Sequence, residues 1–359
     1  MILKNIINKK KTFIIAEIGV NHNGSIKKAI KFVNIAKKCG ADAVKFQNFK
    51  ASSLVTHDAP KAEYQIKNTK NNSTQFKMLK KLELINDDYL KLIKECKKKD
   101  IQFLSSPFDN ESLSFLKNKL KIQTIKIPSG EINNYNLLAD IKNTPIILST
   151  GMSNIKEIID SINFIFKKKI FKLNKKKQVQ IINKQKLNNI RNKIVVLHCV
   201  TDYPVENKYA NLSAIKKLKE SLNLEVGYSD HTQGILAPSI AVSYGAKVIE
   251  KHLTMNKNEK GPDHKASLNP KEFRQMVDLI REVEVLKGDG IKKKEVCETK
   301  NIKIARKSIV AKKNILKGEK FTLNNITTKR PGTGVSASLF FKFIGKISSK
   351  SYKKDEFVK

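Results

Sequence analysis

The stretch EVGYSDHTQG, residues 225–234, starts as an apolar run and breaks into a polar SDH triplet that ends at His231. The stretch VIEKHLT, residues 248–254, ends in a similar way, with His252 closing its apolar run. In a barrel of parallel strands, apolar side chains fill the core and reactive groups stand at the carboxyl ends of the strands. The two stretches therefore predict two neighbouring strands that bring two histidines to one site.

Short apolar runs of this kind alternate with amphipathic helical patterns from residue 12 to about residue 285. The segment at residues 25–40, for example, repeats apolar residues at helical spacing and ends at Gly40, a typical helix-terminating residue. Alternating strands and helices predict a parallel sheet, and eight such units predict an α/β fold of the (β/α)8 TIM-barrel type. The expected strands are residues 12–19, 43–49, 102–108, 124–130, 145–151, 194–200, 225–231 and 248–254.

Two segments interrupt this alternation. The connection at residues 50–85, after the second strand, is long enough to act as a lid or a substrate-binding loop. The segment at residues 166–193, before the sixth strand, is rich in Lys and Asn. We expect this second segment to be exposed and partly mobile, with no chemical role.

The pattern changes again past residue 290, where short strand-like runs are separated by glycine turns and by the motif RPGTG. This change predicts a separate, small β-rich domain after a charged linker. We predict a barrel domain at residues 1–285, a linker at 286–300 and the small domain at 301–359.

Length and composition agree with this organisation, because 359 residues suit a large barrel with a small appendage. No stretch approaches the roughly 20 uninterrupted apolar residues of a membrane span. We expect no signal peptide, since the apolar N-terminal run continues into patterned sequence without a small-residue cleavage site. The four cysteines lie far apart, in neither a metal-ligand nor a disulfide spacing. These features predict a cytoplasmic protein without a membrane partner.

The chain is strongly basic, with 71 Lys and Arg against 33 Asp and Glu and a net charge of +38. Such a charge raises the alternative of a basic nucleic-acid-binding protein. However, the lysines are spread over the predicted helix surfaces and form no single stripe interleaved with aromatic residues. We therefore expect no nucleic-acid partner, and retention on DNA near physiological salt would support the alternative.

Polar residues stand at the predicted carboxyl ends of all eight strands, which meet at one mouth of a barrel. Lysines and hydroxyl side chains that converge with glycine turns are suited to binding an anion such as phosphate. Two lysines in apolar strands are a strong signal, because an unpaired buried ammonium group is costly. The polar strand-end residues are Glu17, Lys45, Gln47, Ser105, Ser106, Lys126, Ser129, Glu131, Ser149, Thr150, Thr201, Tyr203, Ser229, Asp230, His231 and His252.

His231 and His252, on adjacent strands, are candidates to chelate one divalent metal ion and leave positions open for water and substrate. Asp230, Asp263 and Glu17 are expected nearby. The alternative is that each histidine only caps its strand through a hydrogen bond.

Two other histidines are expected to have structural roles. His198 lies deeper in its strand and is expected to be a hydrogen-bonded core residue. His22 is expected to support the first loop, where Asn23 or Ser25 can cap the following helix.

The sequence resembles the sialic acid synthase family, the bacterial N-acetylneuraminate synthases that condense phosphoenolpyruvate with N-acetylmannosamine. The resemblance extends over nearly the whole chain. The motifs that carry it are AEIGVNHNGS (16–25), AVKFQNFKA (43–51), APKAEYQIKNT (59–69), FLSSPFD (103–109), IKIPSGEINN (125–134), ILSTGM (147–152), LHCVTDYP (197–204), GYSDHT (227–232), IEKHLT (249–254), GPDHKASLNP (261–270) and TTKRPGTG (327–334).

The resemblance implies a barrel followed by a SAF (antifreeze-like) domain that reaches over the partner's barrel in a domain-swapped homodimer. It implies that His231 and His252 hold Mn²⁺ or Mg²⁺, and that Glu17 and Glu131 move protons. The residues implied to bind the phosphate and carboxylate of phosphoenolpyruvate are Lys45, Ser106, Lys126, Ser129, Ser149 and Ser229. Those implied to contact the N-acetylated hexosamine or other polar substrate groups are Glu17, Gln47, Thr201, Tyr203, Asp263 and, from the neighbouring chain, Arg330.

The function predicted from this resemblance is that of an N-acetylneuraminate synthase, a phosphoenolpyruvate-dependent transferase of sialic acid biosynthesis. The nearest alternative keeps the reaction and changes the sugar: a synthase of N,N'-diacetyllegionaminate or another nonulosonate, acting on a di-N-acetyl 6-deoxy hexose. A barrel aldolase that releases no phosphate and a carbohydrate-binding module without turnover are more distant alternatives.

Overall fold

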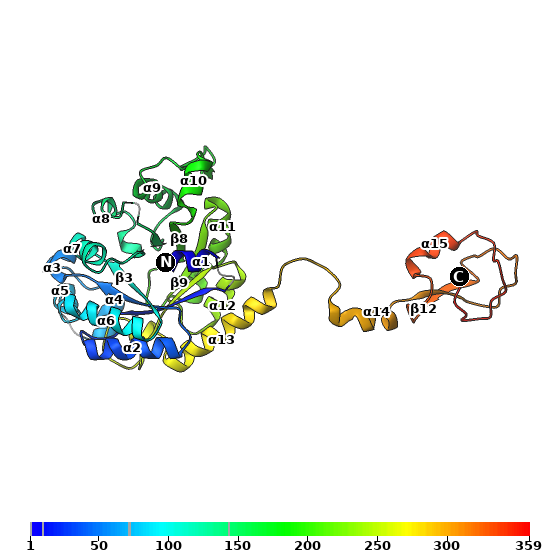
Figure 1. Ribbon diagram of the computed structural model, residues 1–359, viewed down its shortest axis with the longest axis horizontal. Coiled ribbons are helices and arrows are strands. Elements are labelled where there is room, and N and C mark those ends of the chain that lie inside the picture. Colours follow the sequence, from blue (N-terminus) through cyan, green and yellow to red (C-terminus); the bar gives the residue numbers. More distant parts are fainter. Residues whose placement is uncertain (1, 9–10, 71–72, 143) are drawn as a thin grey trace. The chain divides into compact units, whose positions relative to one another are not determined.

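Eight parallel strands form one sheet in the order β3-β2-β1-β10-β9-β8-β5-β4 (Figure 1). The computed structural model describes residues 2–8, 11–70, 73–142 and 144–359. All eight predicted strands are present: β1 (Phe13–Gly19), β2 (Ala43–Asn48), β3 (Gln102–Pro107), β4 (Ile125–Ile127), β5 (Ile146–Ser149), β8 (Ile194–Cys199), β9 (Glu225–Asp230) and β10 (Val248–His252). β1, β8 and β10 are buried along their whole length, as expected for parallel strands covered on both faces.

The sheet curves into a barrel, because β1 pairs with β10 and the two end strands, β3 and β4, are in contact. This arrangement confirms the predicted (β/α)8 fold. Helices surround the strands in Figure 1. They are α2 (Ile26–Lys38), α6 (Asn86–Lys98), α7 (Asn110–Ser114), η1 (Phe115–Lys119), α8 (Tyr135–Ala139), α9 (Ile155–Ile165), α10 (Lys184–Arg191), α11 (Ser213–Leu222), α12 (Leu236–Ser243) and α13 (Pro270–Lys287). Short helical turns follow some strands, namely η2 (Ser129–Glu131), η3 (Asn207–Tyr209) and η4 (His264–Ala266).

Helix α2 shows how local sequence sets these elements. The Ser25 side chain accepts a hydrogen bond from the Lys28 amide and caps the helix, as predicted. Gly40 follows the helix with a φ of +86°, a conformation that glycine adopts without strain. The helix therefore begins and ends where its capping residues stand.

Helix α1 (Ile2–Asn8) closes the inner core of the barrel. Ile2, Leu3 and Ile6 are buried in a cluster with apolar residues of the strands. The strand residues in that cluster are Phe13, Ile15, Ala43, Leu104, Ile147, Val195, Leu197 and Val248. Because several of them stand at strand starts, α1 packs at the amino-terminal end, opposite the end where the predicted site lies.

The long connection at residues 50–85, which we call the β2–α6 connection, contains three short helices. They are α3 (Ala51–Leu54), α4 (Glu63–Thr69) and α5 (Gln75–Lys80). Residues 71 and 72 of this connection lie outside the described residues. The connection adds apolar side chains above the strand ends and is considered with the site below.

The Lys- and Asn-rich segment at residues 166–193 is more ordered than predicted. It forms the antiparallel hairpin β6 (Phe171–Leu173) and β7 (Val179–Ile181), followed by α10. The expectation of an exposed segment was wrong in part, because Ile170, Phe171, Leu187 and Ile190 are buried in the outer core of the barrel. Apolar residues spaced between lysines pack inward while the lysines face solvent. A chemical role for this segment stays unassigned.

A second compact unit follows, since the chain divides into Met1–Gly288 and Asp289–Lys359. The second unit contains η5 (Val296–Glu298), α14 (Thr299–Ala305), the antiparallel strands β11 (Ser308–Ala311) and β12 (Ile326–Lys329), η6 (Ala337–Leu339) and α15 (Phe340–Phe343). Its small core consists of Ile309, Ala311, Ile315, Phe321, Ile326, Tyr352 and Val358. The predicted linker boundaries, 286 and 300, stay a prediction.

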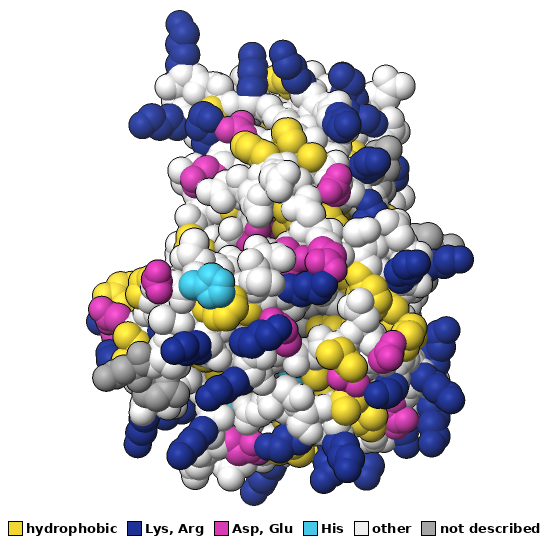
Figure 2. All heavy atoms as spheres, turned by 90° about the vertical axis from the view of Figure 1, so that its left-hand side faces the viewer, with side chains coloured by type: hydrophobic (Ala, Val, Ile, Leu, Met, Phe, Trp, Pro, Cys, Tyr) yellow, Lys and Arg dark blue, Asp and Glu magenta, His cyan; other side chains and the backbone are white. Residues whose placement is uncertain are grey.

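On the face shown in Figure 2, Lys and Arg side chains are scattered among uncharged and acidic side chains. Within the described parts of the chain, every helix is too short or too polar to cross a lipid bilayer.

Candidate active site

A cavity of about 290 Å³ opens at the carboxyl ends of the strands, where the sequence predicted a site. Its volume suits small-molecule ligands. Twelve predicted site residues line it: Glu17, Lys45, Gln47, Lys126, Ser129, Ser149, Thr201, Tyr203, Ser229, His231, His252 and Asp263. Residues that are far apart in the sequence are therefore gathered at one end of the barrel, as predicted.

Lys45 carries a buried ammonium group that contacts neighbouring carboxylate and hydroxyl groups. The strand register sets Lys45 of β2 beside Glu17 of β1, and its Nζ lies 2.8 Å from Glu17 Oε2. Nζ also donates a hydrogen bond of 3.2 Å to Ser106 Oγ. Burial opposes the charged form, but the Glu17 and Glu250 carboxylates outweigh it and raise the pKa of Lys45. The charge that an anionic ligand needs is thus maintained at this position.

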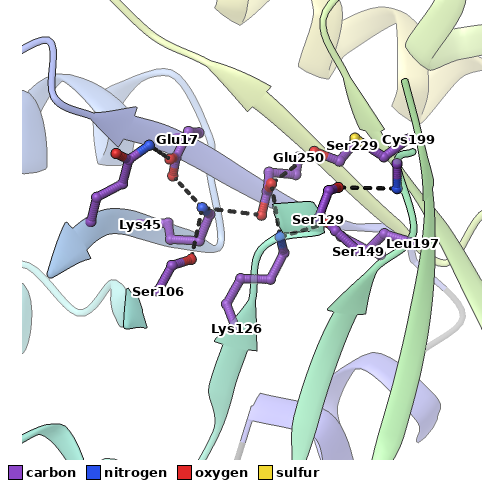
Figure 3. Close-up of polar contacts among 12 residues, drawn as sticks. Glu17, Lys45, Ser106, Lys126, Ser129, Ser149, Leu197, Cys199, Ser229 and Glu250 are labelled. Carbon is purple, nitrogen blue, oxygen red and sulfur yellow. Dashed lines mark hydrogen bonds and ion pairs between the residues drawn. The ribbon is translucent and has the colours of Figure 1, made fainter. Parts of the chain in front are cut away.

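Lys126 is the second buried ammonium group. Its Nζ donates a 2.7 Å hydrogen bond to Ser149 Oγ on the neighbouring strand β5 and lies 3.4 Å from Glu250 Oε1. Burial lowers the pKa of Lys126, with a smaller opposing effect from Glu250. The two lysines approach the same space from β2 and β4 (Figure 3).

Glu250 was missed by the sequence reasoning, although it lies between the two lysines in Figure 3. Its Oε2 is 3.7 Å from Lys45 Nζ, and its Oε1 accepts a 2.8 Å hydrogen bond from Ser229 Oγ. Burial disfavours the carboxylate, but Lys126 and Lys45 outweigh burial and lower the pKa of Glu250. Alternation along β10 could have identified it, because Glu250 faces the same side of the strand as His252.

Hydroxyl groups and a glycine lie close together after β4 and β5. Gly151 donates its backbone N–H to Ser129 Oγ at 3.0 Å. A Cβ at Gly151 would overlap Thr201 Oγ1, so this close approach requires glycine. Among the described residues, Thr201 Oγ1 is buried and has no hydrogen-bond partner. The Thr201 hydroxyl is therefore available to a ligand.

The two predicted metal-binding histidines lie side by side, with ring centroids 5.6 Å apart. His231 Nδ1 lies 2.7 Å from the Val200 carbonyl oxygen, and donation to that oxygen leaves Nε2 free for a ligand. Within the described chain, His252 Nδ1 is buried and has no hydrogen-bond partner. Burial and the adjacent His231 lower the pKa of His252, which favours the neutral imidazole that metals bind.

These features fit a divalent ion held by two imidazoles, with further ligands from water or substrate. The described residues contain no cluster of three or more His, Cys, Asp or Glu side chains suited to a metal. Any metal ion held by these two imidazoles would therefore need further ligands from outside this pair of side chains.

Asp230 does not join the histidines, contrary to expectation. Its Oδ2 lies 2.6 Å from Lys251 Nζ, in a pair with both side chains fully buried, and its Oδ1 accepts a 2.8 Å hydrogen bond from the Thr232 amide. Lys251 also donates to the Thr232 carbonyl. Because side chains alternate along a strand, Asp230 and Lys251 face away from the cavity that His231 and His252 line. The pair braces the turn that carries His231.

Three predicted site residues lie outside the cavity lining formed by the described residues. Ser106 is buried and is linked to the cavity by the hydrogen bond that it accepts from Lys45, which does line it. Glu131 accepts a 2.6 Å hydrogen bond from Asn134 Nδ2, and burial raises its pKa. Arg330 belongs to the second unit, where its Nε donates to the Ala305 carbonyl at 3.0 Å.

Two further histidines, His198 and His22, have the predicted structural roles. His198 is buried, and its Nε2 lies 2.9 Å from the Ala210 carbonyl oxygen. His22 Nδ1 accepts a 3.0 Å hydrogen bond from the Gly24 amide in the first loop.

Another part of the cavity lining is apolar. We define the apolar side as the cavity-lining residues Val20, Phe49, Leu54, Val55, Met78, Leu79, Leu82 and Phe108. We define the polar side as Glu17, Lys45, Lys126, Ser149, Ser229, His231, Glu250 and His252. The cavity thus offers charged groups to one part of a ligand and hydrocarbon to another.

Comparison with known proteins agrees with this geometry. The model of the NeuB family matches residues 32–292, and that of the SAF domain matches residues 306–359. An N,N'-diacetyllegionaminic acid synthase from Campylobacter jejuni is 48% identical over 98% of this chain and 99% of its own. The enzyme of the same name from Legionella pneumophila is 40% identical over 93% of this chain and 89% of its own. The solved structure of an N-acetylneuraminic acid synthetase from Leptospira borgpetersenii is similar with a TM-score of 0.65 and 31% identity, covering 81% of this chain and 90% of that one.

Proposed function

The chain belongs to the NeuB family, and we propose that it is a nonulosonate synthase that makes N,N'-diacetyllegionaminate. In the proposed reaction, phosphoenolpyruvate condenses with a di-N-acetyl 6-deoxy hexose and water, and inorganic phosphate is released. The observation that carries this proposal is the convergence of two buried lysines and two imidazoles on one cavity.

The choice of sugar differs from the one predicted first. Two relatives named as N,N'-diacetyllegionaminic acid synthases share 48% and 40% identity with this chain, whereas the N-acetylneuraminic acid synthetase of known structure shares 31%. These values support the alternative over N-acetylneuraminate. N-acetylneuraminate synthesis is the second candidate, and the motifs quoted above support it.

Lys45, Lys126 and the hydroxyls of Ser149 and Ser229 are proposed to hold the phosphate and carboxylate of phosphoenolpyruvate. Their ammonium and hydroxyl donors are prepositioned by hydrogen bonds of 2.7–3.2 Å, which lowers the cost of ordering them around an anion. Ser106 and Ser129 support this set, Ser106 through Lys45 and Ser129 through the Gly151 amide.

His231 and His252 are proposed to hold Mn²⁺ or Mg²⁺, which would polarise the aldehyde of the open-chain sugar. C3 of phosphoenolpyruvate forms a bond to that aldehyde carbon, water adds at C2, and the C2–O bond to phosphate breaks. Glu17, beside Lys45 and Gln47, is placed to move a proton in the cavity. A positioned acid–base group of this kind typically contributes about 10²–10⁴ in rate.

The remaining predicted roles concern the sugar and the partner chain. Gln47, Thr201, Tyr203 and Asp263 are proposed to contact the sugar, because they line the cavity beside the histidines. Glu131 is proposed as a further proton carrier near the cavity. Arg330 is proposed to meet an N-acetyl group of the sugar from the second chain of a domain-swapped homodimer.

The test is a turnover assay with phosphoenolpyruvate, Mn²⁺ and a panel of N-acetylated and di-N-acetylated hexoses. Phosphate release and the mass of the nonulosonate are measured for each sugar. We expect the highest kcat/KM with the di-N-acetyl sugar. A higher kcat/KM with N-acetylmannosamine would instead support the second candidate, and turnover without phosphate release would contradict both.

A further inference from the structure

Most residues of the apolar side of the cavity come from one segment. Leu54, Val55, Met78, Leu79 and Leu82 belong to the β2–α6 connection, and they pack into a cluster that is separate from the barrel core. Val20, Phe49 and Phe108, from the ends of neighbouring strands, complete the lining. These side chains also line the cavity, so a ligand bound there contacts their hydrocarbon surface.

Polar groups near the apolar side are already engaged with one another. Gln65 Oε1 accepts hydrogen bonds from the Ala62 amide at 3.0 Å and from Gln75 Nε2 at 3.5 Å. Gln65 Nε2 donates to Tyr64 OH at 3.3 Å, and the Tyr64 ring packs on Tyr203 at 5.0 Å between centroids. These amides would have to give up partners in order to bind a sugar hydroxyl.

We propose that the apolar side is the subsite for the 6-methyl group of the sugar and that it selects 6-deoxy hexoses over their 6-hydroxy counterparts. This assignment rests on the proposed synthase function and adds the residues that set selectivity at one carbon. The reacting aldehyde is directed to the polar side, where the imidazoles and lysines lie. The far end of the sugar chain then meets hydrocarbon.

The expected selectivity follows from desolvation. Burial of a methyl group against Met78, Leu79 and their neighbours is favourable, because apolar surface is removed from water. Burial of a hydroxymethyl group there is unfavourable, because its hydrogen bonds to water are lost and not replaced. Apolar pockets reject a ligand that carries one extra hydroxyl by about 10- to 100-fold. We expect kcat/KM for a 6-deoxy sugar to exceed that for its 6-hydroxy counterpart by this factor.

Four sugars separate this proposal from the proposed function. Two carry one acetamido group and two carry a pair, and each set contains a 6-deoxy and a 6-hydroxy member. Preference between the sets tests the proposed function, because it reports the number of acetamido groups. Preference within a set tests the apolar side, because only the oxygen on C6 changes. Equal kcat/KM for both members of each set that turns over would overturn the proposal.

Variants locate the selectivity on the named residues. Val20→Thr adds a hydroxyl to the apolar side with little change in shape, and Met78→Gln adds an amide at similar length. We expect each folded variant to narrow the 6-deoxy preference by at least about threefold, because the 6-hydroxyl gains a partner. Ala51→Ser is the matched control, since Ala51 is buried in the same cluster but lies outside the described cavity lining.

Thermal melting of each variant establishes that it is folded before kinetics are compared. An unchanged preference in both folded variants would overturn the assignment, as would an equal narrowing in Ala51→Ser. If neither variant folds, the wild-type ratio within each sugar set decides the question alone. A change in the KM for phosphoenolpyruvate is not expected, because its proposed partners lie on the polar side.

Discussion

The polar and apolar sides of the cavity take their residues from different parts of the fold. The polar side takes its residues from six strands or the positions directly after them, and its charged side chains are almost fully buried and paired. The apolar side takes five of its eight residues from one connection that packs as a separate cluster. The register of the strands therefore positions the charged groups and imidazoles. The β2–α6 connection supplies most of the apolar surface of the cavity.

This division implies that the polar side tolerates substitution poorly. A buried charge that loses its partner costs about 3–5 kcal/mol, so each change there affects both catalysis and the barrel. Changes in the β2–α6 connection are expected to affect substrate choice first. The predictions below test this contrast.

The largest effect is expected from His231→Ala on the polar side. Loss of one of two imidazole ligands should lower metal-dependent kcat/KM by at least about 10³-fold, since the open site has few protein ligands to spare. The measurement is phosphate release across a Mn²⁺ titration.

His57→Ala serves as the control for this variant, because His57 is exposed in the connection and lies outside the described lining. Full activity of His231→Ala in the presence of a chelator would rule out the metal role. Chelation of the wild-type enzyme should reproduce the loss, and added Mn²⁺ should reverse it.

Asp263 lines the cavity, and burial, with a contribution from Glu17, raises its pKa to about 7. The folded chain therefore keeps a proton that the unfolded chain loses near pH 4. Stability from this group is fully present below that pH and is lost as the pH rises through about 7. We expect the free energy of unfolding of metal-free wild type, relative to Asp263→Asn, to fall by about 2–3 kcal/mol between pH 5 and pH 8.

The measurement is urea denaturation of both proteins at the two pH values, followed by subtraction. Subtraction removes titrations that the two proteins share. A constant difference, or one that grows with pH, would contradict the raised pKa.

Glu250→Gln tests the charge balance of the polar side. The carboxylate lies 3.4 Å from Lys126 and 3.7 Å from Lys45, so its removal leaves two ammonium groups with less compensation. We expect inorganic phosphate to bind about tenfold more tightly, equivalent to roughly 1.4 kcal/mol. Calorimetric titration of phosphate into the metal-free protein measures this.

A change at an exposed pair provides the control for Glu250→Gln. Glu220 lies 4.0 Å from Lys216 on the surface of α11, and Glu220→Gln should leave phosphate affinity unchanged. Weaker phosphate binding by Glu250→Gln would show that Glu250 orients the lysines more than it neutralises them.

The same contrast explains what the sequence could predict. Strands with apolar runs and polar ends indicated the barrel and eleven residues of its cavity, because alternation and burial act locally. Asp230 was misplaced and Glu250 overlooked because neighbouring positions on a strand face opposite sides, and the phase of each strand was not used. The length of the 50–85 connection suggested a lid or a substrate-binding loop, but its apolar cavity residues were not predicted, since they are ordinary core types until the fold sets them around a cavity.

The smallest effect is expected at a hydrogen bond that attaches the β2–α6 connection to the segment after β10. Asn68 of α4 donates a 2.6 Å hydrogen bond to the carbonyl of Pro262, the residue before Asp263. Removing it with Asn68→Ala should loosen α4 and raise the KM for the sugar about fivefold, in line with a net hydrogen-bond value near 1 kcal/mol. The KM for phosphoenolpyruvate should not change, because α4 supplies none of its proposed partners. Lys67→Ala, at the exposed neighbouring position, is the control. Equal effects of Asn68→Ala on both substrates would mean that the connection also holds the polar side in place, and the two sides could not then be treated as separable.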